Sequence, residues 1–287
     1  MKTAVALGTF DGVHAGHKAV LSAAANSGLR SIAVAFRIPP KIFSLNEGII
    51  ITDEPLKTRL IKETGIKEID YLDFEKVKDL SAEDFFFSLK KTYNPQLIVC
   101  GYNYTFGKGG KGNVKLLREL CNKSDIALKV IDSVCAGDIP ISSTYIRELL
   151  KNGNIKEANR LLPTAFSVTA SVIHGERRGR KMDFPTFNQR YPLNMQAVKR
   201  GVYFTSTVID GKTYFGMTNI GYRPTFPLDY TICETHLFDF RGDLYDKTLT
   251  LTLIDFIREE KHFASLNELK ASIEKDKEAI LKLMKEV

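Results

Sequence analysis

The chain has 287 residues, of which 44% are hydrophobic and 26% charged, and its formal net charge is +7. This length exceeds what one ordinary hydrophobic core holds, so we expect a globular protein of two domains. No apolar run approaches the ~18–20 residues that span a bilayer. The short apolar run at the N-terminus lacks the long core and cleavage site of a signal peptide. The sequence therefore predicts a cytoplasmic protein without membrane partners.

The positive charge is compatible with scattered surface lysines, with nucleic acid as a partner, or with small anionic substrates. Basic residues cluster at 177–181 and 108–115, and both clusters contain glycine. Glycine-rich basic loops suit closure over phosphates better than they suit tracking a nucleic-acid backbone. We therefore expect small phosphate-bearing ligands and no nucleic acid.

The first half of the chain alternates apolar runs with amphipathic segments, which is the pattern of βαβ units. Ser81, followed by Ala82, Glu83 and Asp84, is typical of a helix start. The pattern predicts a parallel sheet with helices on both faces, and ligands of such sheets bind beyond the carboxyl ends of the strands. The predicted strands are residues 4–7, 31–36, 66–72, 97–101 and 126–131, and the predicted helices are 18–26, 54–64, 82–93 and 114–123.

The pattern changes after Pro163, where we place the boundary between domains of residues 1–163 and 164–287. Asp210-Gly211 between two β-branched runs is typical of a hairpin, and the many short alternating strands predict a small antiparallel β-barrel. Ser265-Leu266-Asn267-Glu268 reads as the capping box of a C-terminal helix. We expect an apolar stripe of that helix to pack against the barrel, formed by Leu269, Ile273, Ile280 and Met284.

The stretch ALGTFDGVHAGHKAVL places His14 and His17 at a predicted helix start, where both can face one ligand. A metal site, a helix cap and a phosphate site are the alternatives. A zinc pair usually has a third ligand, and only Asp11 lies near in the sequence. The phosphate alternative explains more residues, because Gly8 would allow a tight turn and Gly16 a close backbone approach to a ligand. The helix N-terminus adds free N–H groups and partial positive charge.

Residues 8–17, GTFDGVHAGH, resemble the HxGH signature of the nucleotidyltransferase superfamily. Its members catalyse attack on the α-phosphorus of a nucleoside triphosphate with release of pyrophosphate. Residues 141–147, ISSTYIR, resemble the second motif of that superfamily, with hydroxyls suited to capping a helix and bonding phosphate. Residues 101–108, GYNYTFGK, resemble an element of the flavin-adenylylating subgroup. The resemblance implies that His14, His17 and Arg147 are catalytic and that Gly8, Phe10, Asp11, Gly16, Asn103, Ser143 and Thr144 bind ATP.

The second half carries motifs similar to those of riboflavin kinases, in that family's order. Residues 179–188, GRKMDFPTFN, resemble its PTxN loop. Together the two halves resemble the bacterial bifunctional riboflavin kinases/FAD synthetases. This implies a Rossmann-like nucleotidyltransferase domain with a parallel sheet, followed by a small riboflavin kinase-like antiparallel β-barrel with a C-terminal helix. The further matching motifs are GVY at 201–203, NIGYRPTF at 219–226, ETH at 234–236 and FRGDLY at 240–245.

The kinase resemblance implies roles for individual residues. Thr186 and Asn188 would help hold Mg²⁺ and ATP, since this hard ion prefers oxygen ligands. Glu234 would be the general base for the ribityl 5′-hydroxyl of riboflavin; the alternative is a surface or ion-paired acid. Arg180 and Lys181 would belong to a flap over the nucleotide phosphates and bind ATP.

Three departures from the family pattern fall in or next to the predicted kinase domain. Asp183 and Asp246 stand where glycine is usual, and Leu161-Leu162-Pro163-Thr164 replaces the usual junction. If the family's glycine serves a positive φ, the Asp183 side chain strains its loop. His236 shares a strand face with Glu234, and a packed strand residue is the alternative that we retain for it.

The leading hypothesis is FAD biosynthesis by two reactions that use ATP and Mg²⁺. The first domain would convert ATP and FMN to FAD and pyrophosphate, and the second would convert ATP and riboflavin to FMN and ADP. One alternative is an FAD synthetase whose kinase domain binds flavin but turns over weakly or not at all. Another is a non-catalytic flavin- or RNA-binding regulator, suggested only by the net charge. The expected partners are flavins and ATP, and no particular oligomeric state is predicted.

Overall fold

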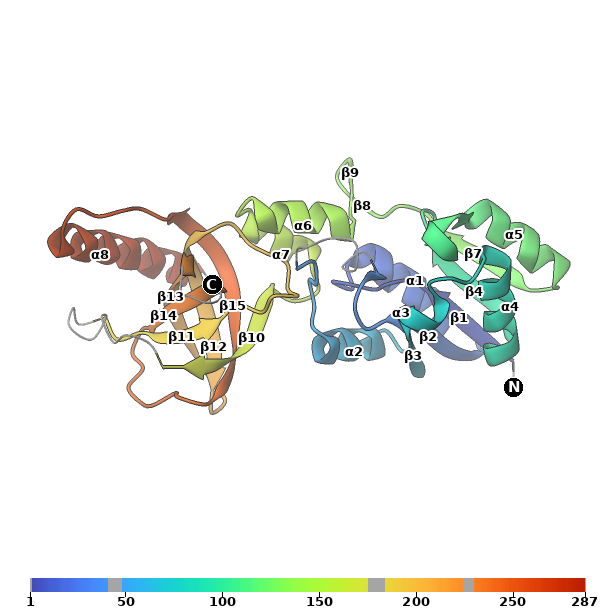
Figure 1. Ribbon diagram of the computed structural model, residues 1–287, viewed down its shortest axis with the longest axis horizontal. Coiled ribbons are helices and arrows are strands. Elements are labelled where there is room, and N and C mark those ends of the chain that lie inside the picture. The colour runs from blue at the N-terminus through green and yellow to red at the C-terminus, as the bar shows by residue number, and fades with distance from the viewer. Residues whose placement is uncertain (1, 41–47, 175–183, 224–229, 287) are drawn as a thin grey trace. The chain divides into compact units, whose positions relative to one another are not determined.

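The computed structural model describes residues 2–40, 48–174, 184–223 and 230–286. The chain forms two compact units: Met1–Ile146 with Leu161–Pro163, and Arg147–Arg160 with Thr164–Val287 (Figure 1). Residues 147–160 thus group with the second unit, whereas the domain boundary that we predict follows residue 163; that boundary stays a prediction. None of the described helices combines the length and apolar composition needed to cross a bilayer.

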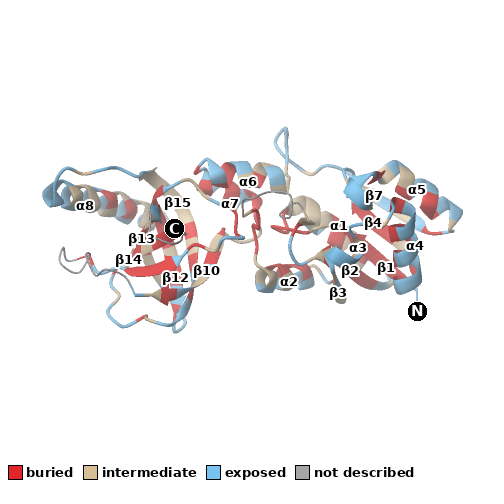
Figure 2. Ribbon diagram, viewed as in Figure 1, coloured by how far each residue is buried: buried red, intermediate tan, exposed pale blue. Residues whose placement is uncertain are grey.

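The first unit is built on a five-stranded parallel sheet of order β3-β2-β1-β4-β7. The predicted parallel α/β fold is confirmed. Strand β1 is buried throughout, as Figure 2 shows, because both faces of the sheet are covered. The strands are β1 Thr3–Leu7, β2 Arg30–Phe36, β3 Glu68–Leu72, β4 Pro95–Gly101 and β7 Ala127–Ile131.

Two apolar clusters hold helices to the opposite faces of this sheet. Helices α1 (Ala15–Ala25) and α2 (Glu54–Glu63) pack on one face, and α4 (Ala82–Tyr93) and α5 (Val114–Lys123) pack on the other. Successive residues of β1 join alternate clusters, as the two-residue period of a strand requires. The short elements are α3 Phe74–Val77, β5 Thr105–Phe106, η2 Lys108–Gly110, β6 Gly112–Asn113, β8 Cys135–Ala136 and β9 Ile139–Pro140.

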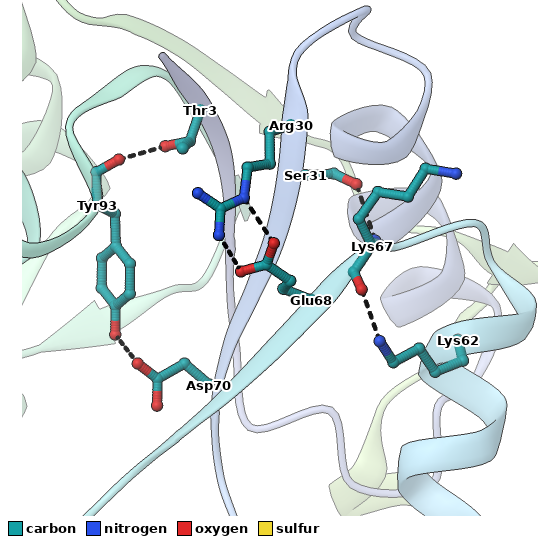
Figure 3. Close-up of polar contacts among 8 residues, drawn as sticks. All are labelled: Thr3, Arg30, Ser31, Lys62, Lys67, Glu68, Asp70 and Tyr93. Carbon is teal, nitrogen blue, oxygen red and sulfur yellow. Dashed lines mark hydrogen bonds and ion pairs between the residues drawn. The ribbon is translucent and has the colours of Figure 1, made fainter. Parts of the chain in front are cut away.

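Polar contacts gather at the amino-end edge of the sheet (Figure 3). Arg30 binds Glu68 through two hydrogen bonds of 2.6 and 2.5 Å, and Tyr93 Oη donates to Asp70 at 2.7 Å. Thr3 Oγ1 donates to the Tyr93 carbonyl at 2.7 Å. A surface pocket of about 430 Å³ opens here. It lies at the end of the strands opposite to the one where ligands of parallel sheets bind.

Helices α6 (Ser143–Lys151) and α7 (Ile155–Leu161) follow the sheet in the chain. Asn159 on α7 donates from Nδ2 to the Leu253 carbonyl at 2.9 Å and accepts from the Phe166 N–H at 2.8 Å. One amide side chain therefore fixes α7 to the start of the barrel within the second unit.

The second unit is an antiparallel β-barrel, which confirms the predicted fold; the barrel is closed, and its strand order is β10-β11-β14-β13-β12-β15. The predicted hairpin is confirmed, with Asp210 at φ 50° and Gly211 at φ 79° between β12 and β13. Strand β11 was not predicted, because this short segment carries the buried polar side chains of Asn188 and Gln189. The strands are β10 Ser167–Ile173, β11 Phe187–Arg190, β12 Gly201–Ile209, β13 Lys212–Arg223, β14 Tyr230–Leu237 and β15 Thr248–Glu259.

The chain ends in helix α8 (Leu266–Leu283), followed by η4 (Met284–Glu286). Ile280 is fully buried and packs in one cluster with Ile273, Met284 and barrel residues such as Phe204, whereas Leu269 is outside this cluster. Ser265 caps the helix by accepting from the Glu268 N–H. The reciprocal bond of a capping box differs from the prediction, because the Glu268 carboxylate accepts from the N–H of Ala264 instead of that of Ser265.

Candidate functional site

The first part of the candidate site lies at the carboxyl ends of β1 and β4. These strands are neighbours, with Leu7 opposite Cys100 in the register. The loop that begins at Gly8 and the turn at residues 101–103 therefore emerge side by side. The order of strands reverses between β1 and β4, and ligands of open α/β sheets bind at such a switch point.

The two histidines of this loop are packed as a pair. Their rings stack with centroids 3.8 Å apart and an interplanar angle of 23°. Phe10 meets the His17 ring edge-on at 5.5 Å. A Cβ at Gly8 would come within 2.8 Å of the Phe10 ring, and one at Gly16 would come within 3.2 Å of the His14 ring. The glycines thus make room for aromatic rings, in addition to the roles expected from the sequence.

Backbone strain accompanies this packing. Phe10 and Val13 have φ values of 50° and 40°, in the left-handed region that non-glycine residues rarely occupy. Both side chains are fully buried. Surrounding contacts hold such conformations where a functional geometry requires them, and here they turn the chain so that His14 immediately precedes α1.

The N-terminus of α1 faces the same edge of the sheet. His14 is its N-cap residue, 5% exposed, and its carbonyl accepts from the Lys18 N–H at 2.9 Å. Among the described residues, no side chain caps α1, and its first turn contains no acidic residue. A helix N-terminus of this kind, with free N–H groups and the positive end of the helix dipole, is suited to binding an anion.

Asp11 has a structural role within the first unit. Its fully buried carboxylate accepts from the N–H groups of Ile51 and Thr52 at 2.9 and 3.2 Å. The Gly12 N–H in turn donates to Thr52 Oγ1 at 3.0 Å. These bonds fasten the histidine loop to the segment that precedes α2.

Lys57 lies in the interior near Asp11. Its amine donates to the carbonyls of Phe36 and Arg37 at 2.6 and 2.8 Å, at the end of β2. Burial lowers the pKa of Lys57 to about 8, while Asp11 raises it and Arg37 lowers it further. The amine connects α2 to the carboxyl end of β2, beside the histidine loop.

The second predicted motif contacts the first directly. Ser143 Oγ donates to the Asp11 carbonyl at 2.9 Å, and Ser142 Oγ accepts from the Tyr145 N–H at 3.1 Å. Ser142 therefore caps α6. Thr144 is exposed, and Arg147 is half-buried one turn into the helix.

The third predicted motif forms the turn after β4. The Tyr102 N–H donates to Ile131 and the Tyr104 N–H to Gly101, which leaves Asn103 exposed between them. The glycine-rich basic stretch that follows contacts the end of the segment before α4, where the Lys108 N–H donates to the Leu80 carbonyl at 2.7 Å. Its Lys108 pairs with Asp79 at 2.9 Å.

The second part of the candidate site lies on the barrel. Asn188 on β11 is directly opposite Glu234 on β14, and Glu234 is directly opposite Asn219 on β13. Cross-strand partners share a sheet face, so the three side chains form one row. Asn188 is 7% exposed, and its Oδ1 accepts no hydrogen bond from the described residues.

Thr186 lies one residue before β11 and is exposed. The carbonyl of the preceding Pro185 is 2.9 Å from Nδ1 of His236, which is two residues beyond Glu234 on β14. Continuing the register of β11 and β14 places Thr186 opposite His236. Thr186, Asn188, Glu234 and His236 therefore share one face of this strand pair.

Part of the predicted kinase site lies outside the described residues: Arg180, Lys181 and Asp183. Asp246, the other position where the family usually has glycine, has φ 62°. The conformation thus accounts for a glycine there, and aspartate is one of the few other residues that tolerate it.

The side chains at and near Asn188 offer oxygen ligands for the expected Mg²⁺. Within the described ranges, no three His, Cys, Asp or Glu side chains gather as a metal site. Mg²⁺, however, commonly takes few protein ligands and completes its shell with water and phosphate oxygens. A buried amide oxygen without a donor and a nearby threonine hydroxyl fit that requirement.

A family model described as FAD synthetase matches residues 1–145, and one described as riboflavin kinase matches residues 162–284. The bifunctional riboflavin kinase/FMN adenylyltransferase of Bacillus subtilis (strain 168) is 33% identical over 294 residues, which cover 98% of this chain and 92% of the relative. The protein of the same name from Escherichia coli (strain K12) is 32% identical, with coverages of 94% and 89%. The chain belongs to this bifunctional family.

A solved crystal structure of a protein named macrolide-efflux protein, from Streptococcus pneumoniae, is also similar. It is 30% identical with a TM-score of 0.86, and the match covers 97% of this chain and 93% of that one. The folds of both units are therefore shared over nearly the whole chain. The name of that protein differs from the flavin activities in the names of the curated relatives and adds no argument about the present site.

Two further residues of the kinase-type site lie in motifs seen in the sequence but were given no role there. Asn219 joins the row of Asn188 and Glu234 through the β13–β14 register, which the sequence does not reveal. His236 contacts Pro185 across a pair of strands of which β11 was not predicted. The spacing of two residues between Glu234 and His236 was the available signal, and it indicated only a shared face.

Proposed function

We propose that this family member catalyses both steps from riboflavin to FAD, with FMN adenylylation in the first unit and riboflavin phosphorylation on the barrel. The observation that carries the first assignment is the stacked pair of His14 and His17 at the α1 N-terminus, at the switch point of the sheet. The proposed partners are ATP and flavins, and the cytoplasmic location stays a prediction.

In adenylyl transfer, a phosphate oxygen of FMN attacks the α-phosphorus of ATP, and the bond to pyrophosphate breaks. His14 and His17 donate to phosphoryl oxygens as negative charge develops, together with the α1 N–H groups. Asn103, Ser143, Thr144 and Arg147 complete the proposed nucleotide site from their two motifs. Asp11 supports it indirectly, because its carboxylate is directed to the Ile51 and Thr52 amides.

The row of Asn188 and Glu234 favours the second activity. Glu234 accepts the proton of the ribityl 5′-hydroxyl of riboflavin while that oxygen attacks the γ-phosphorus of ATP and ADP departs. Asn188 Oδ1 and the Thr186 hydroxyl would hold Mg²⁺, and Arg180 and Lys181 are proposed to bind ATP. When bound, Mg²⁺ neutralises charge on the phosphates.

The test supplies the protein with Mg²⁺, ATP and either riboflavin or FMN, and separates the flavins by chromatography. The proposal expects FMN and FAD from riboflavin, and FAD and pyrophosphate from FMN. FAD from FMN without FMN from riboflavin would contradict the kinase half and favour an FAD synthetase alone. Absence of both products would contradict catalysis and favour a binding protein.

A further inference from the structure

The contact between His236 and Pro185 connects the strand of the proposed base to the segment of the proposed metal ligand. Nδ1 of His236 lies 2.9 Å from the Pro185 carbonyl oxygen. Glu234 is two residues away on the same strand, and Thr186 directly follows the carbonyl.

The chemistry of this contact determines the state of the ring. A carbonyl oxygen only accepts, so Nδ1 carries the proton. Burial lowers the pKa of His236, the bond to Pro185 raises it, and the positive charge of Lys277 lowers it. The neutral ring can therefore make this bond at neutral pH without adding positive charge beside the proposed nucleotide site.

The ring also packs against aromatic neighbours, at 5.3 Å from Phe184 and 5.7 Å from Phe238, both edge-on. Packing alone would be served by phenylalanine at this position. Donation to the Pro185 carbonyl, in contrast, needs an N–H near Nδ1, which phenylalanine lacks and asparagine can supply. Two substitutions therefore separate the two roles of the ring.

We propose that His236 is a positioning residue of the kinase site. Through the Pro185 carbonyl it fixes the peptide that carries Thr186, at a set position relative to Glu234 and Asn188 on the same strand pair. The inference rests on the proposed riboflavin kinase activity. Displacement of a metal-binding hydroxyl by a fraction of an ångström weakens nucleotide positioning without unfolding the barrel.

The experiment compares His236→Phe with His236→Asn in the full-length protein, with His262→Phe as the matched control at an exposed histidine. Riboflavin phosphorylation and FMN adenylylation are measured in each variant, with the Mg²⁺ and ATP dependence of the former. The dissociation constant of Mg·ADP is also measured by calorimetry, because this measures nucleotide binding independently of turnover. All variants carry His17→Ala in this measurement, so that they share one background.

We expect His236→Phe to lower kinase kcat/KM about tenfold or more, mainly through KM for Mg·ATP, and to weaken Mg·ADP binding to a similar extent. His236→Asn should retain most of the activity, and His262→Phe and all adenylylation rates should match the wild type. Unchanged kinase activity in His236→Phe would overturn the inference, as would equal losses in the Phe and Asn variants. A wild type that makes FAD from FMN but no FMN from riboflavin would instead refute the proposed kinase function, and this inference with it.

Discussion

Each histidine of the pair depends on residues that surround it in the sequence. Phe10 supports His17 from one side, and Gly16 leaves space for His14 on the other. Left-handed backbone at a non-glycine residue costs on the order of 1–3 kcal/mol, and this loop contains it at both Phe10 and Val13. The strained loop is thus maintained by buried packing, which keeps two imidazoles in a fixed arrangement before a ligand arrives.

The first prediction concerns His17→Ala. Removal of one preorganised donor should lower adenylyl transfer by about 10²–10³-fold and leave riboflavin phosphorylation unchanged, because the imidazole lies in the first unit. Both rates are measured by flavin chromatography on the same preparation. Equal loss of the two activities would mean that the residue matters for folding instead of for catalysis.

The second prediction concerns Asp246, at φ 62°. Asp246→Gly should stabilise the barrel by about 0.5–1 kcal/mol, because glycine adopts this conformation without steric cost. Urea unfolding measures the change. Lys247→Gly is the control, since Lys247 is also exposed and its φ is not positive, so glycine there should destabilise. A loss of stability in Asp246→Gly would contradict the assignment of strain.

At the scale of single residues, the sequence identified the histidine pair but did not predict its supports. The roles expected for Gly8 and Gly16 were a tight turn and approach to a ligand. The structure adds the packing of the Phe10 and His14 rings, which depends on positive φ values. No propensity scale predicts such a conformation for a β-branched residue such as Val13.

At the scale of elements, helix α8 is held on the barrel by apolar packing and by an ion pair between Asp276 and Arg258. Asp276 is 5% exposed and accepts from Nε and Nη2 of Arg258 on β15, at 2.7–3.0 Å. The pair lies beside the cluster that contains Ile280. Arg258 would be left with an incompletely paired charge if the carboxylate were removed.

The third prediction is therefore that Asp276→Ala destabilises the second unit by about 2–3 kcal/mol. This loss is smaller than that expected on breaking a fully buried ion pair, because Arg258 keeps some contact with water. Glu274→Ala, at an exposed position on the same helix, is the matched control. Thermal and urea unfolding measure both variants. A loss below about 0.5 kcal/mol in Asp276→Ala would contradict a structural role for the pair.

Regular elements were predictable where a cap and an apolar stripe coincide. Asp53, Ser81 and Asn113 each cap their helix, and α4 and α5 have the predicted bounds. Strand β11 was missed because Gln189 is buried for its hydrogen bonds to the carbonyls of Ala170 and Leu249, and not for an apolar side chain. A buried polar strand gives no alternating hydrophobic signal.

At the scale of the whole molecule, buried thiols in both units contribute to how stability changes in alkaline solution. Burial raises the pKa of Cys100 and Cys121 to about 11 and that of Cys233 to about 12, from an ordinary value of 9.0. Cys100 is raised further by Cys121, while Arg118 opposes the shift of both. The unfolded chain loses these protons first, so their contribution is complete below about pH 9 and declines as pH rises toward 11–12.

The fourth prediction follows from these directions. Between pH 9 and 11, the free energy of unfolding of Cys233→Ala should fall less steeply than that of the wild type. This holds whatever the difference in free energy of unfolding between the two proteins at pH 8. Cys135→Ala, at an exposed cysteine, should retain the wild-type slope. Because the lowered pKa of Lys57 acts in the opposite direction above pH 8, slopes are compared between variants by urea unfolding at each pH. Equal slopes for Cys233→Ala and wild type would refute the prediction.

The overall plan was predictable because two patterns with different periods follow each other in the chain. The parallel sheet and the barrel are confirmed. The strand order and the register between Asn188, Glu234 and Asn219 were not predictable, because they depend on long-range pairing. The motifs therefore identified site residues, but only the strand pairing shows that Asn188, Glu234 and Asn219 lie in one row.

The pairing of β1 with β4 has a consequence for how the protein acquires activity during synthesis. Leu7 and Cys100 are neighbours in the sheet, yet most of the first unit is translated between them. At ~5–20 residues per second, this interval takes on the order of 5–20 s. A nascent chain that ends before β4 holds the histidine loop without the strand beside it. Nucleotide binding should therefore begin late, as a property of the assembled sheet and not of the emerging N-terminal segment.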